Sequence, residues 1–126
     1  EETRRIGGCP TGEARSSKGY RLPAGWVIHT VGPVWSGGGR DEEKLLANCY
    51  RNCFKVAGEL GVRSIAFPSI STGAYGFPLQ RATEIALDET RKVLETDDGL
   101  EKIIFVCFGA KVLDVYQDVY KQVFGE

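Results

Sequence analysis

Three short runs of apolar residues predict the strands of a sheet. They cover residues 26–31, 64–70 and 102–108, and in each run the apolar residues are nearly continuous rather than alternating. Continuous runs of this length are typical of strands that are covered on both faces. A more polar segment at 11–22 is compatible with a further strand or ribbon.

Each apolar run is followed by a stretch in which apolar residues recur at helical spacing. The three stretches begin near Leu45, Leu79 and Val112. Gly61 is placed to end the first helix, and Pro78 stands at the start of the second, where a proline is tolerated. The alternation of strand and helix predicts βαβ units and a largely parallel sheet, so the fold class is α/β.

Composition and charge indicate one globular domain and exclude some partners. The chain has 126 residues, of which 42% are hydrophobic and 26% charged, which suits a single domain over 1–126. The formal net charge of −1 argues against a broad electrostatic grip on nucleic acid or on an anionic membrane. No apolar run approaches the roughly 20 residues of a membrane span. We therefore expect an anionic ligand to be held locally, by backbone groups.

The cysteines are interpreted as reduced thiols, and Cys49, Cys53 and Cys107 are expected to be buried in the core. Cys49 and Cys53 are four residues apart in a helical pattern, which places them on one apolar face, and Cys107 lies inside an apolar run. The sequence has no C-x-x-C motif and His29 is its single histidine, so no metal site is expected. Reduced thiols favour a cytoplasmic protein.

Most other polar features have an ordinary structural interpretation. His29 stands alone in an apolar strand, and we expect it to pack in the core. The acids at 41–43 begin a helix, where negative charge favours the dipole, and those at 97–98 suit a solvated turn. The glycine-rich segment 36–40 is interpreted as a plain connection between a strand and a helix.

The segment 69–78, Ser-Ile-Ser-Thr-Gly-Ala-Tyr-Gly-Phe-Pro, is the best candidate for chemistry. It leaves the carboxyl end of a strand and enters a helix, which is where ligands bind in open α/β sheets. Gly73 and Gly76 can adopt positive φ, so the N–H groups of 71–75 can form a nest for a phosphate or diphosphate. The segment lacks the Gly-Lys-Ser/Thr ending of a Walker A loop. A connection that only turns the chain remains the alternative.

The aromatic side chains near this segment leave a choice open. Tyr75 and Phe77 supply flat surfaces for a sugar or a base. Phe108 ends the last predicted strand, and the pattern alone allows it to face either the core or the ligand cleft.

With these residues laid out, the chain resembles a macro domain, close to the bacterial hydrolases that act on O-acetyl-ADP-ribose and mono-ADP-ribosylated protein. The resemblance rests on five motifs in this order and spacing. They are Gly-Cys-Pro-Thr-Gly-Glu-Ala at 8–14, Leu-Pro-Ala at 22–24, His-Thr-Val-Gly-Pro at 29–33 with Trp35, the segment 66–78, and Val-Cys-Phe at 106–108.

The resemblance implies a three-layer α/β/α fold with a mostly parallel or mixed sheet, and it implies roles for individual residues. The loop around the diphosphate and the distal ribose would be formed by Ser71, Thr72, Gly73, Ala74, Tyr75 and Gly76. Tyr75 matches an aromatic residue that packs beside that ribose and helps to shape the hydrolytic site, so its catalytic role would be accessory. Phe108 matches an aromatic residue that flanks the adenine. The implied partners are ADP-ribose, O-acetyl-ADP-ribose and mono-ADP-ribosylated protein, without a cofactor, metal or membrane.

The sequence also departs from the family pattern. It contains no Asn-Ala-Ala-Asn segment and no Gly-Gly-Gly-Val-Asp loop, the loop whose Asp would activate or orient the attacking water. We therefore expect the chain to hold the C-terminal portion of the family fold, with the N-terminal strands absent. Three functions stay open: a hydrolase, an ADP-ribose-binding module without turnover, and an incomplete domain that needs a partner segment.

Overall fold

The computed structural model describes residues 9–18, 26–96 and 99–125, and in these ranges the predicted strands and helices are confirmed. The predicted turn at 97–98 lies outside the described residues. In chain order the elements are β1 (Ala14–Lys18), β2 (Trp26–Thr30), α2 (Glu42–Leu60), β3 (Ser64–Phe67), the 3-10 turn η1 (Gly73–Tyr75), α3 (Leu79–Thr96), β4 (Lys102–Phe105) and α4 (Ala110–Phe124).

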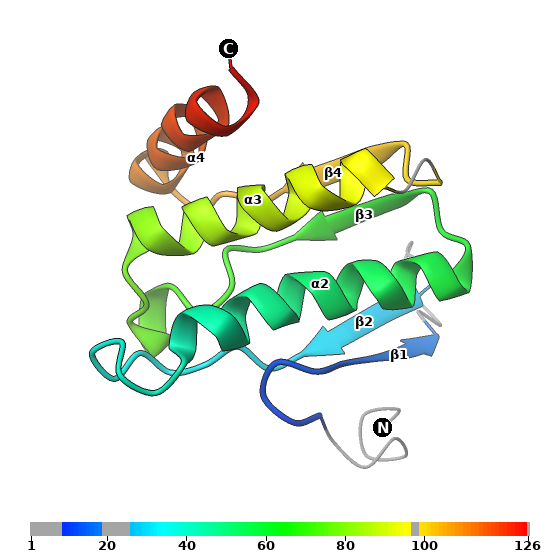
Figure 1. The fold of residues 1–126 in the computed structure, drawn as a ribbon, viewed down its shortest axis with the longest axis horizontal. Coiled ribbons are helices and arrows are strands. Elements are labelled where there is room, and N and C mark those ends of the chain that lie inside the picture. Colours follow the sequence, from blue (N-terminus) through cyan, green and yellow to red (C-terminus); the bar gives the residue numbers. More distant parts are fainter. Residues whose placement is uncertain (1–8, 19–25, 97–98, 126) are drawn as a thin grey trace.

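The strands form two pairs of different kinds, so the strand pairing is mixed. β1 and β2 are antiparallel, with Ala14 opposite Thr30, whereas β3 and β4 are parallel, with Phe67 opposite Phe105. Among the described residues β2 and β3 are not hydrogen-bonded to each other, but they point in the same direction (Figure 1). The carboxyl ends of β2, β3 and β4 therefore face the same edge of the molecule.

The core lies between the strands and the two long helices. α2 supplies Leu46, Tyr50 and Phe54, all buried, and α3 supplies Ala82 and Ile85. Aromatic rings link the layers, with 5.1 Å between the ring centroids of Tyr50 and Phe67 and 5.6 Å between those of Phe67 and Phe105. Helix α4 packs on α3 through a second cluster formed by Leu87, Tyr116 and Val119.

The prediction that both faces of the apolar strands are covered is wrong for β3 and β4 in the described part of the chain. Phe67 is buried on the side of the helices, whereas Ala66 is exposed and Ile104 and Val106 keep 40% and 41% of their surface accessible. The physical reason is that α2 and α3 pack against one face of this pair (Figure 1). The side chains alternate in burial, as expected for a strand with one covered face.

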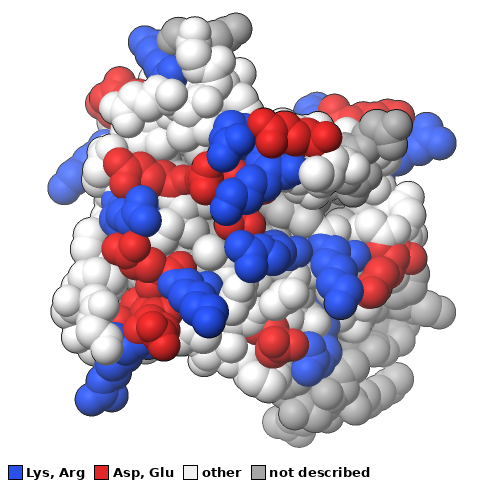
Figure 2. All heavy atoms as spheres, in the orientation of Figure 1, with Lys and Arg blue, Asp and Glu red and all other residues white. Residues whose placement is uncertain are grey.

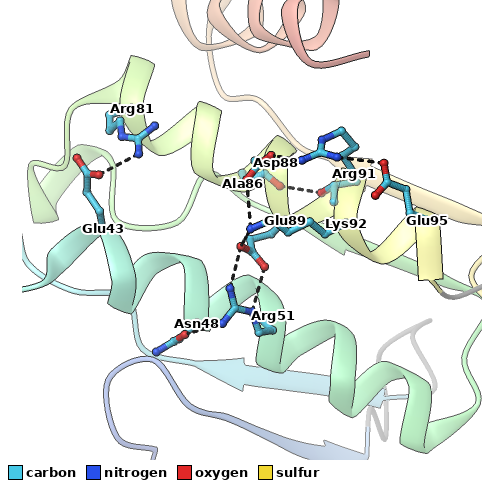
Figure 3. Close-up of polar contacts among 11 residues, drawn as sticks. Glu43, Asn48, Arg51, Arg81, Ala86, Asp88, Glu89, Arg91, Lys92 and Glu95 are labelled. Atoms are coloured by element: carbon cyan, nitrogen blue, oxygen red, sulfur yellow. Dashed lines mark hydrogen bonds and ion pairs between the residues drawn. The ribbon is translucent and has the colours of Figure 1, made fainter.

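Helices α2 and α3 are also joined by ion pairs on their outer face (Figure 3). The Glu89 carboxylate, only 6% exposed, accepts hydrogen bonds from Arg51 Nε at 3.2 Å and Nη2 at 3.1 Å, and from Lys92 Nζ at 3.2 Å. Arg81 of α3 pairs with Glu43 of α2 at 2.9 Å. Acidic and basic side chains are interspersed over this face (Figure 2).

The cysteines are free thiols. Cys49 and Cys53 are buried on α2 as predicted, and burial raises the pKa of Cys53 to about 12. Cys107 is half-buried rather than fully buried as expected, because one face of β4 is left uncovered. Cys9 is also half-buried, and its Sγ lies 3.5 Å from the carbonyl oxygen of His29, itself half-buried on β2. Among the described residues no group of three or more potential metal ligands is found, and no described helix is long and apolar enough to cross a membrane.

Candidate functional site

The loop after β3 is a compact double turn closed by its own backbone. The Gly76 N–H donates to the Gly73 carbonyl and the Phe77 N–H donates to the Ser71 carbonyl, both at 2.9 Å. Gly73 and Gly76 have φ angles of 70° and 74°, which confirms the prediction that these two glycines adopt the left-handed conformation. The loop leaves the carboxyl end of β3 and enters α3, so the predicted position is confirmed as well.

The side chain of Thr72 forms hydrogen bonds with the start of the loop. Its hydroxyl donates to the carbonyl oxygen of Ser69 at 3.1 Å and lies 2.9 Å from the Ser69 hydroxyl. In this structure the hydroxyl is therefore engaged within the loop. The N–H groups at the beginning of the following 3-10 turn, Gly73–Tyr75, have no acceptor within that turn, which is the arrangement that favours an anion.

Ser71 is the residue of the loop that lies against the segment after β2. It is a non-glycine residue at φ 67°, it is buried, and its hydroxyl is the one buried side-chain oxygen without a hydrogen-bond partner in the described part of the chain. The backbone of Gly32, just after β2, lies directly against it, and a Cβ on Gly32 would meet the Ser71 Oγ at 2.2 Å. Gly32 belongs to the His-Thr-Val-Gly-Pro motif at 29–33, but the only sequence signal for this close contact is a Gly-Pro pair at the end of a strand.

The segment after β2 contacts the loop through Trp35. The backbone N–H of Trp35 donates to the Tyr75 carbonyl oxygen at 2.9 Å. The ring centroids of Trp35 and Phe77 are 4.8 Å apart, with an angle of 57° between the ring planes. Phe77 is buried, whereas 42% of Tyr75 is exposed. Of the two predicted aromatic surfaces, Phe77 therefore belongs to the core, and Tyr75 remains accessible to a ligand.

Two tyrosines support the base of the loop. Tyr50 of α2 and Tyr116 of α4 are both buried, and burial raises the pKa of both hydroxyls. For Tyr116, hydrogen bonds with the side chains of Ser69 and Tyr50 partly offset the rise in pKa. For Tyr50, a hydrogen bond with the backbone of Ile70 partly offsets it. Both hydroxyls are therefore neutral at physiological pH and suited to holding the loop rather than to supplying a base.

The structure rules out the core as the place of the Phe108 side chain. This side chain is 79% exposed just beyond the end of β4, so it does not belong to the core. Because β3 and β4 are parallel, Phe108 and the 71–75 loop both leave the same edge of the molecule. Ala74 lies inside η1, between Gly73 and Tyr75.

The site as a whole lies at an uncharged edge of the molecule, where backbone polar groups are available and aromatic rings lie nearby. The segment 69–78 contains no acidic or basic residue, so the binding of an anion would depend on N–H groups rather than on lysine or arginine. A separate groove of about 570 Å³ lies between α2 and α3, and it is lined by Phe54, Val93 and the ion-pair residues rather than by the loop.

Comparison with known proteins places this arrangement in one family. A family model for the macro domain matches residues 1–86. A macro domain-containing protein from Chlorobaculum tepidum is 58% identical over 93% of this chain and 68% of its own length. A protein named O-acetyl-ADP-ribose deacetylase 1 from Pantoea vagans is 46% identical over 89% of this chain and 66% of its own length.

Solved structures agree with the sequence matches. A mutant of the Oceanobacillus iheyensis macrodomain with ADPR superposes with a TM-score of 0.90 at 38% identity, over 99% of this chain and 69% of that one. The chain thus spans about two thirds of the length of these relatives. With most of the chain matched by the family model and a 58% identical relative, the chain belongs to the macro domain family.

Proposed function

We propose that this chain binds ADP-ribose, with the backbone of residues 71–75 around the diphosphate and the distal ribose. The observation that carries the proposal is the 69–78 loop itself. It presents a short turn with left-handed Gly73 and Gly76 at the edge where three strands end. A concave set of backbone N–H groups at such an edge suits a diphosphate, and a macrodomain of similar structure contains ADPR.

The aromatic residues would complete the recognition of the two ends of the ligand. Tyr75, accessible at the loop, would pack beside the distal ribose, and Phe108, exposed beyond β4, would flank the adenine. Stacking of a base on an aromatic ring contributes about 1–3 kcal/mol, which is a large share of the affinity for a small ligand. Ser71, Thr72, Ala74 and Gly76 would shape the loop rather than contact the base.

The test is titration calorimetry of the chain with ADP-ribose, and with ADP and ribose 5-phosphate as separate ligands. A single site that prefers ADP-ribose to either fragment supports the proposal. No heat and no thermal shift with ADP-ribose would refute it. A preference for ribose 5-phosphate over ADP would leave the loop as an anion site but remove the adenine subsite.

Hydrolysis of O-acetyl-ADP-ribose, or removal of mono-ADP-ribose from protein, is the second candidate function. It is favoured by the similar proteins from Pantoea vagans that are named O-acetyl-ADP-ribose deacetylases. In the deacetylation, water would attack the acetyl carbonyl carbon at the distal ribose and the bond between that carbon and the ribose oxygen would break. The ribose oxygen would take a proton, acetate would be released, and Tyr75 would act only by shaping the site. Release of acetate by the purified chain, absent in a Tyr75→Ala variant that still binds ADP-ribose, would support turnover.

The proposal includes a cytoplasmic location and a phosphate-binding loop. The four free thiols are consistent with a reducing compartment, and free ADP-ribose or modified protein would be the partners met there. Fractionation of the source cells, with the chain followed by antibody, would test the location.

A further inference from the structure

The glycine-rich segment 36–40 is wrapped around a buried carboxylate. Glu42, the first residue of α2, is 2% exposed, and its Oε2 accepts hydrogen bonds from the Ser36 N–H at 2.7 Å and the Gly38 N–H at 3.1 Å. Its Oε1 accepts a bond from the Arg40 N–H at 2.7 Å. The side chain thus satisfies three backbone donors of the turn at once, as a bound anion would in a backbone nest.

This carboxylate belongs to the protein, and it binds the turn before α2 rather than the N–H groups that a helix cap would bind. Asp41 stands at the N-cap position in a left-handed conformation, at φ 60°, and makes no side-chain capping bond. The carboxylate one residue later turns back toward the preceding segment, and its position at the helix N-terminus is favourable for negative charge. The turn before α2 is therefore held closed by Glu42 rather than by Asp41.

The closed turn contacts Trp35, and Trp35 contacts the proposed ligand loop. A Cβ built on Gly38 would meet the Trp35 indole at 3.0 Å, so the turn lies directly against this ring. The indole also packs on Phe77, and the backbone N–H of Trp35 donates to the Tyr75 carbonyl oxygen. The turn and the start of α3 lie at the same end of the molecule (Figure 1).

We propose that Glu42 is a positioning residue for the ADP-ribose loop: by closing the 36–40 turn it fixes Trp35, and Trp35 holds Tyr75 and Phe77. The inference rests on the proposed function for its ligand readout alone, because the effect on the loop itself is measurable without a ligand. The charge matters as well as the shape, because a carboxylate accepts at both oxygens, whereas an amide would set an NH₂ donor against a backbone N–H.

The experiment compares Glu42→Gln with Glu89→Gln in the full chain. Glu89 is a matched control, since it is also a buried carboxylate, but it belongs to the ion pairs between α2 and α3. Amide hydrogen exchange is followed at Trp35 and Phe77 without ligand, and ADP-ribose affinity is measured by calorimetry. We expect Glu42→Gln to speed exchange at both amides and to weaken affinity about tenfold, the size of one lost charge-assisted bond. Glu89→Gln should do neither.

The outcomes separate this inference from the proposed function. Unchanged exchange at Trp35 and Phe77 in Glu42→Gln overturns the inference, even where the melting temperature falls. Failure of the wild-type chain to bind ADP-ribose refutes the proposed function and leaves the exchange result to decide the inference. If Glu42→Gln does not fold, Gly38→Ala tests the same turn from its own side, because it presses a methyl group on Trp35 and strains the backbone at φ 90°. Unaltered loop exchange in that variant would again overturn the inference.

Discussion

The backbone of Gly32 lies directly against the side chain of Ser71. A Cβ placed on Gly32 would stand 2.2 Å from Ser71 Oγ and 2.7 Å from Ile70 Cγ2. Ser71 has little room to move, since it is buried and is held in the left-handed conformation. The contact joins the segment after β2 to the loop after β3, so the shape of the proposed binding loop depends on a residue outside it.

Gly32→Ala should therefore destabilise the chain and displace the loop. Overpacking of a buried contact costs about 1–3 kcal/mol in the free energy of unfolding, which urea denaturation measures. Gly39→Ala is the matched control, because a Cβ on Gly39 meets no atom within 4 Å, and it should change stability by less than about 0.5 kcal/mol.

A second substitution at the same contact tests the mechanism. Ser71→Gly removes the Oγ that the new methyl group would meet and suits the left-handed conformation at this position. The double variant should recover part of the stability lost in Gly32→Ala, because the contact of the new methyl group with Ile70 Cγ2 at 2.7 Å remains. A double variant that is no more stable than Gly32→Ala would show that the contact with Ser71 is not the source of the loss.

The stability of the chain should depend on pH through Glu42. Burial raises the pKa of this carboxyl, but backbone hydrogen bonds from Arg40, Ser36 and Gly38 outweigh it, and the pKa falls from 4.5 to about 2. Because the folded-state pKa is depressed, the stabilisation is complete above the unfolded pKa and is lost as the pH falls toward 2.

The measurement is denaturation of wild type and Glu42→Gln from about pH 6 to about pH 3. The gap in unfolding free energy between the two proteins should be widest at the upper end and should shrink as the pH falls. Glu89→Gln, measured in parallel, separates this effect from general acid denaturation. A gap that is constant over the range would contradict the depressed pKa.

Phe108→Ala should weaken the binding of ADP-ribose without lowering stability. The side chain is 79% exposed, so little packing is lost, whereas the loss of one stacked ring weakens binding about tenfold or more. Leu94→Ala is the control, because Leu94 on α3 is also an exposed apolar residue. This variant should leave the affinity for ADP-ribose unchanged. Equal affinities of Phe108→Ala and wild type for ADP-ribose would remove Phe108 from the site.

Glu89→Gln should lower the stability of the fold only slightly and should leave the affinity for ADP-ribose unchanged. Its partners Arg51 and Lys92 have side chains that are 58% and 51% exposed, so both cations can be solvated when the carboxylate is removed. We expect a loss of about 1 kcal/mol in unfolding free energy, measured in urea, and a smaller loss at high salt. A loss that grows with salt would contradict the ion-pair account.

The order of strands and helices was predictable because helical spacing and apolar runs are strong signals, and because Gly61 and Pro78 mark helix boundaries. Positive φ at Gly73 and Gly76 was predictable because glycine is the residue that adopts it without strain. The uncovered face of β3 and β4 was not predictable, because a continuous run of apolar residues does not show whether a helix packs on each face of a strand.

The interactions that hold the site were largely hidden in the sequence. Glu42 was interpreted as an acid that favours the helix dipole, and 36–40 as a plain connection, because the return of a side chain onto an earlier turn leaves no periodic signal. Ser71 carries no residue-type signal for its left-handed conformation, and Gly32 touches it only in the folded chain. Such contacts join segments far apart in sequence, so spacing does not encode them.

Calorimetric titration of wild type, Gly73→Gln and Gly73→Glu with ADP-ribose tests the central claim, that the 71–75 loop holds the diphosphate. A Cβ on Gly73 meets no atom within 4 Å, so both variants should fold with about 1–2 kcal/mol of backbone strain. The account predicts saturable binding to wild type, weaker binding to Gly73→Gln, and none to Gly73→Glu, whose carboxylate repels the diphosphate. Equal affinities of Gly73→Glu and wild type for ADP-ribose would contradict it.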